Sequence, residues 1–103
     1  MKTSENITEI IITEINGKWG RSNLHNVNIR DSLITPEKIK SIDTEDKEVE
    51  VWLVLLENPQ ARLGYGIAYD ETSGEFGLLQ FAEGYEPFLI GLYGTFFDAL
   101  DAM

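Results

Sequence analysis

The fully apolar stretch Val-Trp-Leu-Val-Leu-Leu at residues 51–56 constrains the fold of this 103-residue chain more than any other feature. Charged and apolar side chains alternate just before it, from Glu48 to Val51, as in a strand with one exposed face. An apolar run that follows such an alternation is typical of a central strand buried on both faces. We therefore expect the centre of a sheet at residues 48–57.

Two further strands are expected after it. Residues 63–70 alternate bulky side chains with glycine or alanine, so that one face of the strand is covered and the other is nearly bare. Another element, most simply a helix, is expected to pack on the bare face. Residues 70–74 predict a hairpin loop with Gly74 in the left-handed conformation, and residues 75–81 predict the returning strand.

An amphipathic helix is expected near the N-terminus. Residues spaced four apart form one apolar stripe: Ile7, Ile11, Ile15 and Trp19. Ser4 is the expected N-cap, and Gly17 or Gly20 the expected end. Because the isoleucines are β-branched, a strand remains the alternative for residues 5–19.

A second helix is expected at the C-terminal end, where Thr95 and Asp98 have the spacing of a capping box. Its expected buried face consists of Phe96, Phe97, Leu100 and Met103. Residues 21–31 predict a loop with a short extended piece, and Ile39 to Ile42 an extended segment or turn. The Gly-rich and aromatic residues 82–94 predict a long structured loop.

These elements together predict one α+β domain over residues 1–103. It consists of a small, mainly antiparallel sheet of three to five strands, with an N-terminal and a C-terminal helix packed on it. The chain is long enough for one core of its own and too short for two domains.

Charge is distributed very unevenly along the chain. Residues 41–103 carry thirteen acidic side chains against only Lys47 and Arg62, a balance of −11 within a total of −10. A surface of one sign repels nucleic acid and anionic lipid and attracts basic proteins. We therefore expect a basic protein partner, and neither nucleic acid nor a membrane.

No chemistry of a cofactor, a metal or an enzyme is predicted. The chain has no cysteine, and its only histidine, His25, has no glycine-framed nucleophile near it. His25 is therefore expected to be structural. The N-terminus lacks the apolar stretch of a signal peptide, and no run approaches the roughly 20 residues that span a bilayer, which predicts a cytoplasmic protein.

Three groups of acidic residues are the candidate partner-binding sites. The run at 43–50 and the hairpin at 70–75 supply two groups, and the Gly-rich segment supplies the third. Their members are Asp43, Glu45, Asp46, Glu48, Asp70, Glu71, Glu75, Glu83 and Glu86. A surface that served solubility alone would mix both signs, which favours binding over simple solvation.

Residues 64–78 (GYGIAYDETSGEFGL) and 91–100 (GLYGTFFDAL) resemble segments of small bacterial proteins that include acidic immunity proteins of polymorphic and contact-dependent toxin systems. The resemblance implies an inhibitor that binds and occludes a basic, nuclease-like toxin domain. It identifies no site residue. The alternative is a small-ligand-binding or regulatory domain with a pocket at residues 82–94.

Overall fold

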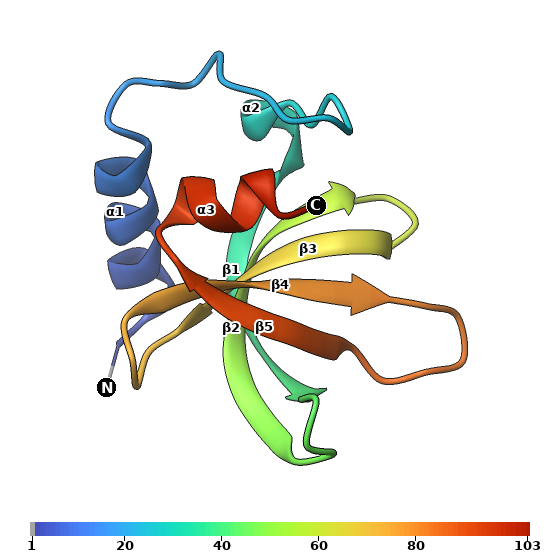
Figure 1. Ribbon diagram of the computed structural model, residues 1–103. Coiled ribbons are helices and arrows are strands. Elements are labelled where there is room, and N and C mark those ends of the chain that lie inside the picture. The colour runs from blue at the N-terminus through green and yellow to red at the C-terminus, as the bar shows by residue number, and fades with distance from the viewer. Residues whose placement is uncertain (1) are drawn as a thin grey trace.

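The computed structural model describes residues 2–103, which form a five-stranded barrel with helices packed on its outside (Figure 1). In chain order the elements are α1 (Ser4–Ile15), α2 (Ile29–Ser32), β1 (Leu33–Ile42), β2 (Glu48–Asn58), β3 (Leu63–Asp70), β4 (Glu75–Phe81), β5 (Phe88–Gly94) and α3 (Phe96–Asp101). Consecutive strands pair antiparallel, and one parallel bridge between Ile42 and Phe88 closes the barrel. The predicted α+β class, with its N-terminal and C-terminal helices, is confirmed.

Strand β2 is buried on both faces, as predicted. Its side chains are shared between two cores: Trp52, Val54 and Leu55 pack with the helices, while Val51, Leu53 and Leu56 fill the barrel interior. The second core draws its residues from all five strands and from no helix. The pairing of β2 with β3 shifts between Leu53 and Leu55, and such a bulge places two successive residues on the same side.

The bare face of β3 is covered differently from the prediction, which was wrong. The helices pack on the bulky face, through Ile67 and Tyr69, whereas Gly66 and Ala68 face the barrel interior. A Cβ atom at Gly66 would lie 2.9 Å from the carbonyl oxygen of Leu55 and 3.0 Å from Phe81 Cε2. The small residues are needed because the sheet curls over itself, so that other strands fill the space beside them.

Helix α1 is confirmed, with different ends. Thr3, not Ser4, is the N-cap, and its hydroxyl accepts the Asn6 N–H in a reciprocal capping box. The helix ends at Ile15, and its C-cap is Asn16, whose φ of 48° is left-handed, so the end comes before Gly17. Trp19 therefore lies beyond the helix, although it still packs against the helix-facing core.

Helix α3 begins at the predicted capping box, in which the Thr95 hydroxyl and the Asp98 carboxylate each accept a backbone N–H of the other. The Phe96 N–H is satisfied by α1, because it donates to Glu14 Oε1 at 2.9 Å. Phe96 is fully buried and packs edge to face on Phe76, whereas Phe97 is only partly buried.

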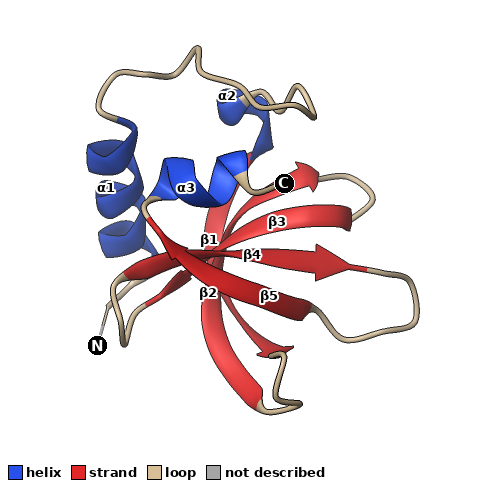
Figure 2. Ribbon diagram, in the orientation of Figure 1, coloured by secondary structure: helices blue, strands red, loops and turns tan. Residues whose placement is uncertain are grey.

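Two segments form strands that were predicted in part or not at all. The extended segment or turn expected from Ile39 to Ile42 is the end of a strand that begins at Leu33. Strand β1 runs through Pro36, and its pairing with β2 is interrupted between Leu33 and Glu37 because proline has no N–H to donate. The predicted long loop at 82–94 is wrong for its second half, where β5 pairs with β4 (Figure 2). Two register shifts in that pairing accommodate the glycines that made the segment resemble a loop.

Removing α3 by truncation after Gly94 is expected to unfold the domain. Phe96→Ala alone should lower the free energy of unfolding by about 3–5 kcal/mol, because it deletes a fully buried ring. Leu24→Ala is the matched control, since Leu24 is 93% exposed, and should change it by less than about 0.5 kcal/mol. Urea denaturation measures both, and an unchanged midpoint for the truncated chain would refute the role of α3.

Candidate protein-binding site

A groove of about 250 Å³ opens between the β1–β2 hairpin and β5. In Figure 1 the hairpin is the green loop at the bottom, below the red β5. Aliphatic side chains and backbone form most of the lining, with a carboxylate from each of two hairpins. The lining residues are Asp43, Thr44, Val49, Val51, Asp70, Leu89, Ile90, Gly91 and Leu92.

The groove exists because the barrel is closed by a single bridge. The Ile42 N–H donates to the Pro87 carbonyl at 2.9 Å, and β1 turns away directly afterwards. Within residues 2–103, no strand pairs with the groove-lining edge of β5 from Leu89 onward. The pairing of β5 with β4 also shifts on either side of Gly91, which bends β5 and interrupts its edge.

Gly77 on β4 sets the position of the β5 wall. A Cβ atom at this position would lie 2.5 Å from the Gly91 carbonyl oxygen and 2.9 Å from Leu92 Cδ2. Glycine is therefore required for β4 and β5 to approach this closely. The same approach holds Leu92, which is 37% exposed, at the groove.

Asp43 and Asp70, which share the groove, are positioned by the turns that follow them. Asp43 Oδ1 accepts the N–H groups of Glu45 and Lys47 at 2.9 and 3.0 Å. Asp70 accepts the Thr72 N–H at 3.2 Å and the Ser73 hydroxyl at 2.9 Å. Both carboxylates are thus fixed by local hydrogen bonds of the kind that Asp forms in turns.

The rest of the first acidic group is less uniform in charge than its sequence indicates. Glu45 lies 3.4 Å from Lys47, and Glu48 on β2 lies 3.5 Å from Lys40 on β1. These pairs are exposed, so they contribute little to stability, but they offset part of the negative charge of the hairpin. Asp46 lies at the hairpin turn and is exposed.

Glu71 in the second group has a structural partner. The Trp52 indole N–H donates to Glu71 Oε1 at 2.9 Å, and this hydrogen bond lowers the pKa of the Glu71 carboxyl. Trp52 is a core residue, as predicted, and its indole N–H is directed to the β3–β4 hairpin. Glu75 begins β4 and is half-buried.

The third group lies beside a separate hollow. Glu83 and Glu86 belong to the β4–β5 loop, which forms a hollow of about 510 Å³ with Ile42, Gln80, Ala82, Gly84, Tyr85, Glu86 and Phe88. Tyr85 is 81% exposed, so the aromatic segment is surface here and core only at Leu89. The structure therefore brings Asp43 and Asp70 to one groove and places Glu86 at another.

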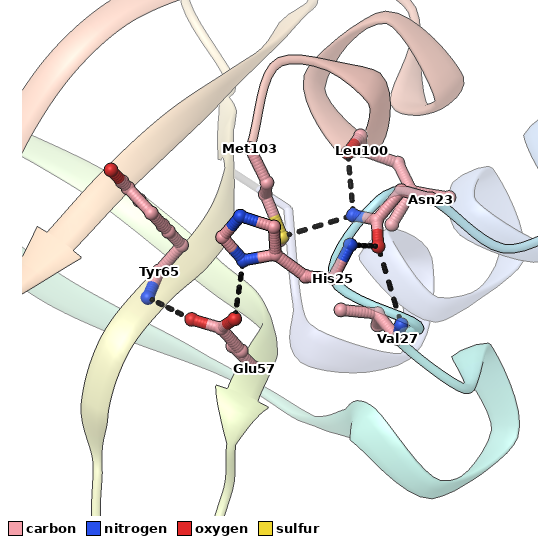
Figure 3. Close-up of polar contacts among 7 residues, drawn as sticks. All are labelled: Asn23, His25, Val27, Glu57, Tyr65, Leu100 and Met103. Atoms are coloured by element: carbon pink, nitrogen blue, oxygen red, sulfur yellow. Dashed lines mark hydrogen bonds and ion pairs between the residues drawn. The ribbon is translucent and has the colours of Figure 1, made fainter.

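A polar cluster around His25 ties the loop before α2 to the barrel (Figure 3). His25 Nδ1 lies 2.5 Å from Glu57 Oε2, and Glu57 Oε1 accepts the Tyr65 N–H at 3.0 Å. Asn23 anchors the same loop to the C-terminal end, because its side-chain amide donates to the Leu100 carbonyl at 2.8 Å. No pattern in the sequence indicates this partner, because Glu57 follows His25 by 32 positions along the chain.

Opposing effects act on the pKa of the Glu57 carboxyl. Burial raises this pKa, but the Tyr65 N–H and then His25 stabilise the charged form and lower it overall. The Ser22 hydroxyl donates to the Val27 carbonyl and not to His25. The contact between His25 and Glu57, named the clasp below, holds the loop against the barrel. No nucleophile is hydrogen-bonded to the imidazole within the described part of the chain.

A further hollow, of about 280 Å³, is lined by residues 19–22 and 26–28 of the loop between α1 and α2. A larger hollow of about 660 Å³ lies along α1, lined by polar side chains apart from Ile10. Among residues 2–103, no group of three side chains that could hold a metal ion is assembled, and none of the described helices is long and apolar enough to cross a membrane. Comparison with protein-family models, curated proteins and solved structures found no match.

The His25–Glu57 clasp predicts a dependence of stability on pH. The folded pKa of Glu57 is below its ordinary value of 4.5, so its contribution is present above pH 4.5 and is lost as the pH falls further. Glu57→Gln should therefore lose less stability than the wild type between about pH 6 and pH 3. Glu83→Gln, which removes the same charge from an exposed loop, should follow the wild type; equal slopes for all three proteins in urea denaturation would contradict the clasp.

Proposed function

We propose that this protein is a non-enzymatic binding module for a basic protein. Its concrete form is an immunity-type inhibitor that occludes a nuclease-like toxin domain, as the sequence resemblance implies. One observation supports the proposal above others: two acidic hairpins flank an apolar groove beside the single bridge that closes the barrel. Aliphatic walls with carboxylates at the rim suit a partner that carries positive charge on an apolar surface.

The charge of this surface is largely uncompensated. Within residues 2–103, Asp70, Glu75, Glu83 and Glu86 form no ion pair, and the only salt bridge of an acid after Arg62 joins Asp101 to Arg21. Such a field accelerates the encounter with a basic protein more than it strengthens the final complex. Fast capture is the property that an inhibitor of a toxic enzyme requires.

Exposed apolar side chains supply contact area next to the groove. Leu92, which lines the groove, and Tyr93, the next residue on β5, are 37% and 41% exposed, whereas Phe88, which is 37% exposed, lines the separate hollow of the β4–β5 loop. Aromatic and aliphatic groups at the centre of an interface contribute most of its affinity, whereas charged groups at the rim contribute specificity and speed. Inhibition would then follow from steric occlusion, with the acidic hairpins lying in the cationic substrate site of the partner.

A second candidate function is the binding of a small ligand, supported by the hollow beneath Tyr85. Its lining combines Phe88 and Ile42 with a single carboxylate, Glu86, which favours an apolar ligand that is neutral or cationic. Tyr85→Ala would weaken the binding of this ligand and leave the binding of the protein partner unaffected.

The dependence of binding on salt tests the principal proposal. The full chain is immobilised to capture the partner, and binding kinetics are then measured with the purified complex at about 50 and 500 mM NaCl. The association rate should fall about ten-fold or more as salt rises, while the dissociation rate changes much less. Neutralising Asp43, Glu45, Asp46 and Glu48 together should mimic high salt, and Asp70, Glu71 and Glu75 form the second set.

His25→Gln is the control for these variants. Glu57, its partner, lies eight residues along β2 from the groove residue Val49, roughly 26 Å for an extended strand. Binding should therefore stay within a few-fold of the wild type. If the association rate is insensitive to salt and neither set of acidic variants alters it, the negative charge serves solvation only. If His25→Gln abolishes binding, the binding site lies at the His25–Glu57 contact and not at the groove.

A further inference from the structure

The groove between the β1–β2 hairpin and β5 has the dimensions and lining of an anchor pocket, not of a strand-pairing edge. A partner strand would need a regular row of free N–H and C=O groups along β5. The pairing of β5 with β4 shifts between Leu89 and Gly91 and again between Leu92 and Gly94, so this edge is irregular. A volume of about 250 Å³ is suited to one large side chain.

The walls and the rim differ in chemistry, and this difference selects the occupant. Val49, Val51 and Leu89 provide aliphatic surface, and Val51 and Leu89 belong to the buried core of the barrel. Asp43 and Asp70 enter the groove from two different hairpins. The lining therefore matches a long side chain with an apolar stem and a cationic end, because such chains bury the stem and keep the charge at a polar rim.

Two carboxylates that arrive from different elements favour arginine over lysine. The guanidinium group presents five N–H donors in a rigid plane and bonds carboxylates along two edges, whereas the ammonium group is a compact point charge. Both Asp carboxylates are held by turn hydrogen bonds, so little freedom remains to be lost when a ligand binds.

A second copy of this chain is a poor occupant, because its net charge of −10 would place like charges together across the groove. We infer that this groove is the anchor site for one arginine side chain of the basic partner, inserted between Asp43 and Asp70. The inference rests on the proposed function and identifies the feature of the partner that the site recognises.

The test uses the full chain labelled with ¹⁵N and three peptides that differ at one position. The probe is acetyl-Gly-Val-Arg-Val-Gly-amide, and in the controls lysine or citrulline replaces the arginine. Citrulline keeps the shape and loses the charge. The arginine peptide should shift the backbone amide signals of Thr44, Val49 and Leu89 to Leu92, with a dissociation constant on the order of 1 mM. The citrulline peptide should bind at least ten-fold more weakly, and the lysine peptide several-fold more weakly.

Asp43→Asn and Asp70→Asn remove one charge each. Asp43→Asn keeps the one oxygen that accepts both turn N–H groups. Asp70→Asn keeps an acceptor for the Thr72 N–H and replaces the oxygen that accepts the Ser73 hydroxyl with an amide that donates. Each should weaken the binding of the arginine peptide about ten-fold, whereas Glu5→Gln, which removes one charge from an exposed position on α1, should leave its affinity unchanged. Leu92→Ser should also weaken it, since Leu92 supplies an exposed part of the apolar wall. Unchanged ¹⁵N spectra away from the groove show that the variants are folded.

Several outcomes would overturn the inference. They are equal binding of the arginine and citrulline peptides, equal binding of the lysine peptide, and shifts centred on Tyr85. The proposed function is judged separately: a basic partner that binds in a salt-sensitive manner but is indifferent to Asp43→Asn and Asp70→Asn leaves that function standing and removes the arginine anchor. If no protein partner binds in a salt-sensitive manner, the proposed function is refuted, regardless of how the peptides bind.

Discussion

The burial of β2 on both faces is the constraint on which the rest of the structure depends. A strand with no exposed face needs an apolar layer on each side. The barrel interior supplies one layer, through Leu53 and its neighbours, and the helices supply the other. Helix α3 has only six residues and would be marginal in isolation, so packing and caps must hold it in place. Asp98, Glu14 and Thr95 accept the backbone N–H groups of Thr95, Phe96 and Asp98 in that order, and the core buries Phe96.

Closure of the barrel positions the candidate site. Five strands bring β1 and β5 together at one bridge, Ile42 with Phe88, and the hairpin after β1 then diverges from the edge of β5. The resulting groove is continuous with the interior core, since Val51 and Leu89 belong to both. An apolar lining at this place is therefore a consequence of the fold. The acidic rim is not, because any polar residue able to form the two hairpin turns would fold equally well.

Local patterns predicted the elements whose signals lie within one segment. The apolar run at 51–56, the isoleucine spacing of α1 and the Thr95–Asp98 box were each sufficient. Segments whose structure depends on a distant partner were missed. Strand β5 contains two glycines and two register shifts, and it is a strand because β4 pairs with it. Likewise, the pairing of His25 with Glu57 and the meeting of Asp43 with Asp70 arise only when the sheet curls, which no spacing along the chain reveals.

The structure divides the acidic residues into two kinds that sequence treats alike. Glu45 and Glu48 have long, exposed side chains beside Lys47 and Lys40, and such charges act through their field over a distance set by screening. Asp43 and Asp70 have short side chains, are half-buried and are fixed by turn hydrogen bonds. A fixed charged side chain at an apolar groove loses little conformational entropy when a partner binds. A partner without a matching positive charge leaves that carboxylate without a counter-charge, so the fixed charge helps to distinguish the right partner from the wrong one. In the β1–β2 hairpin, attraction over a distance and selection at contact would therefore belong to different residues.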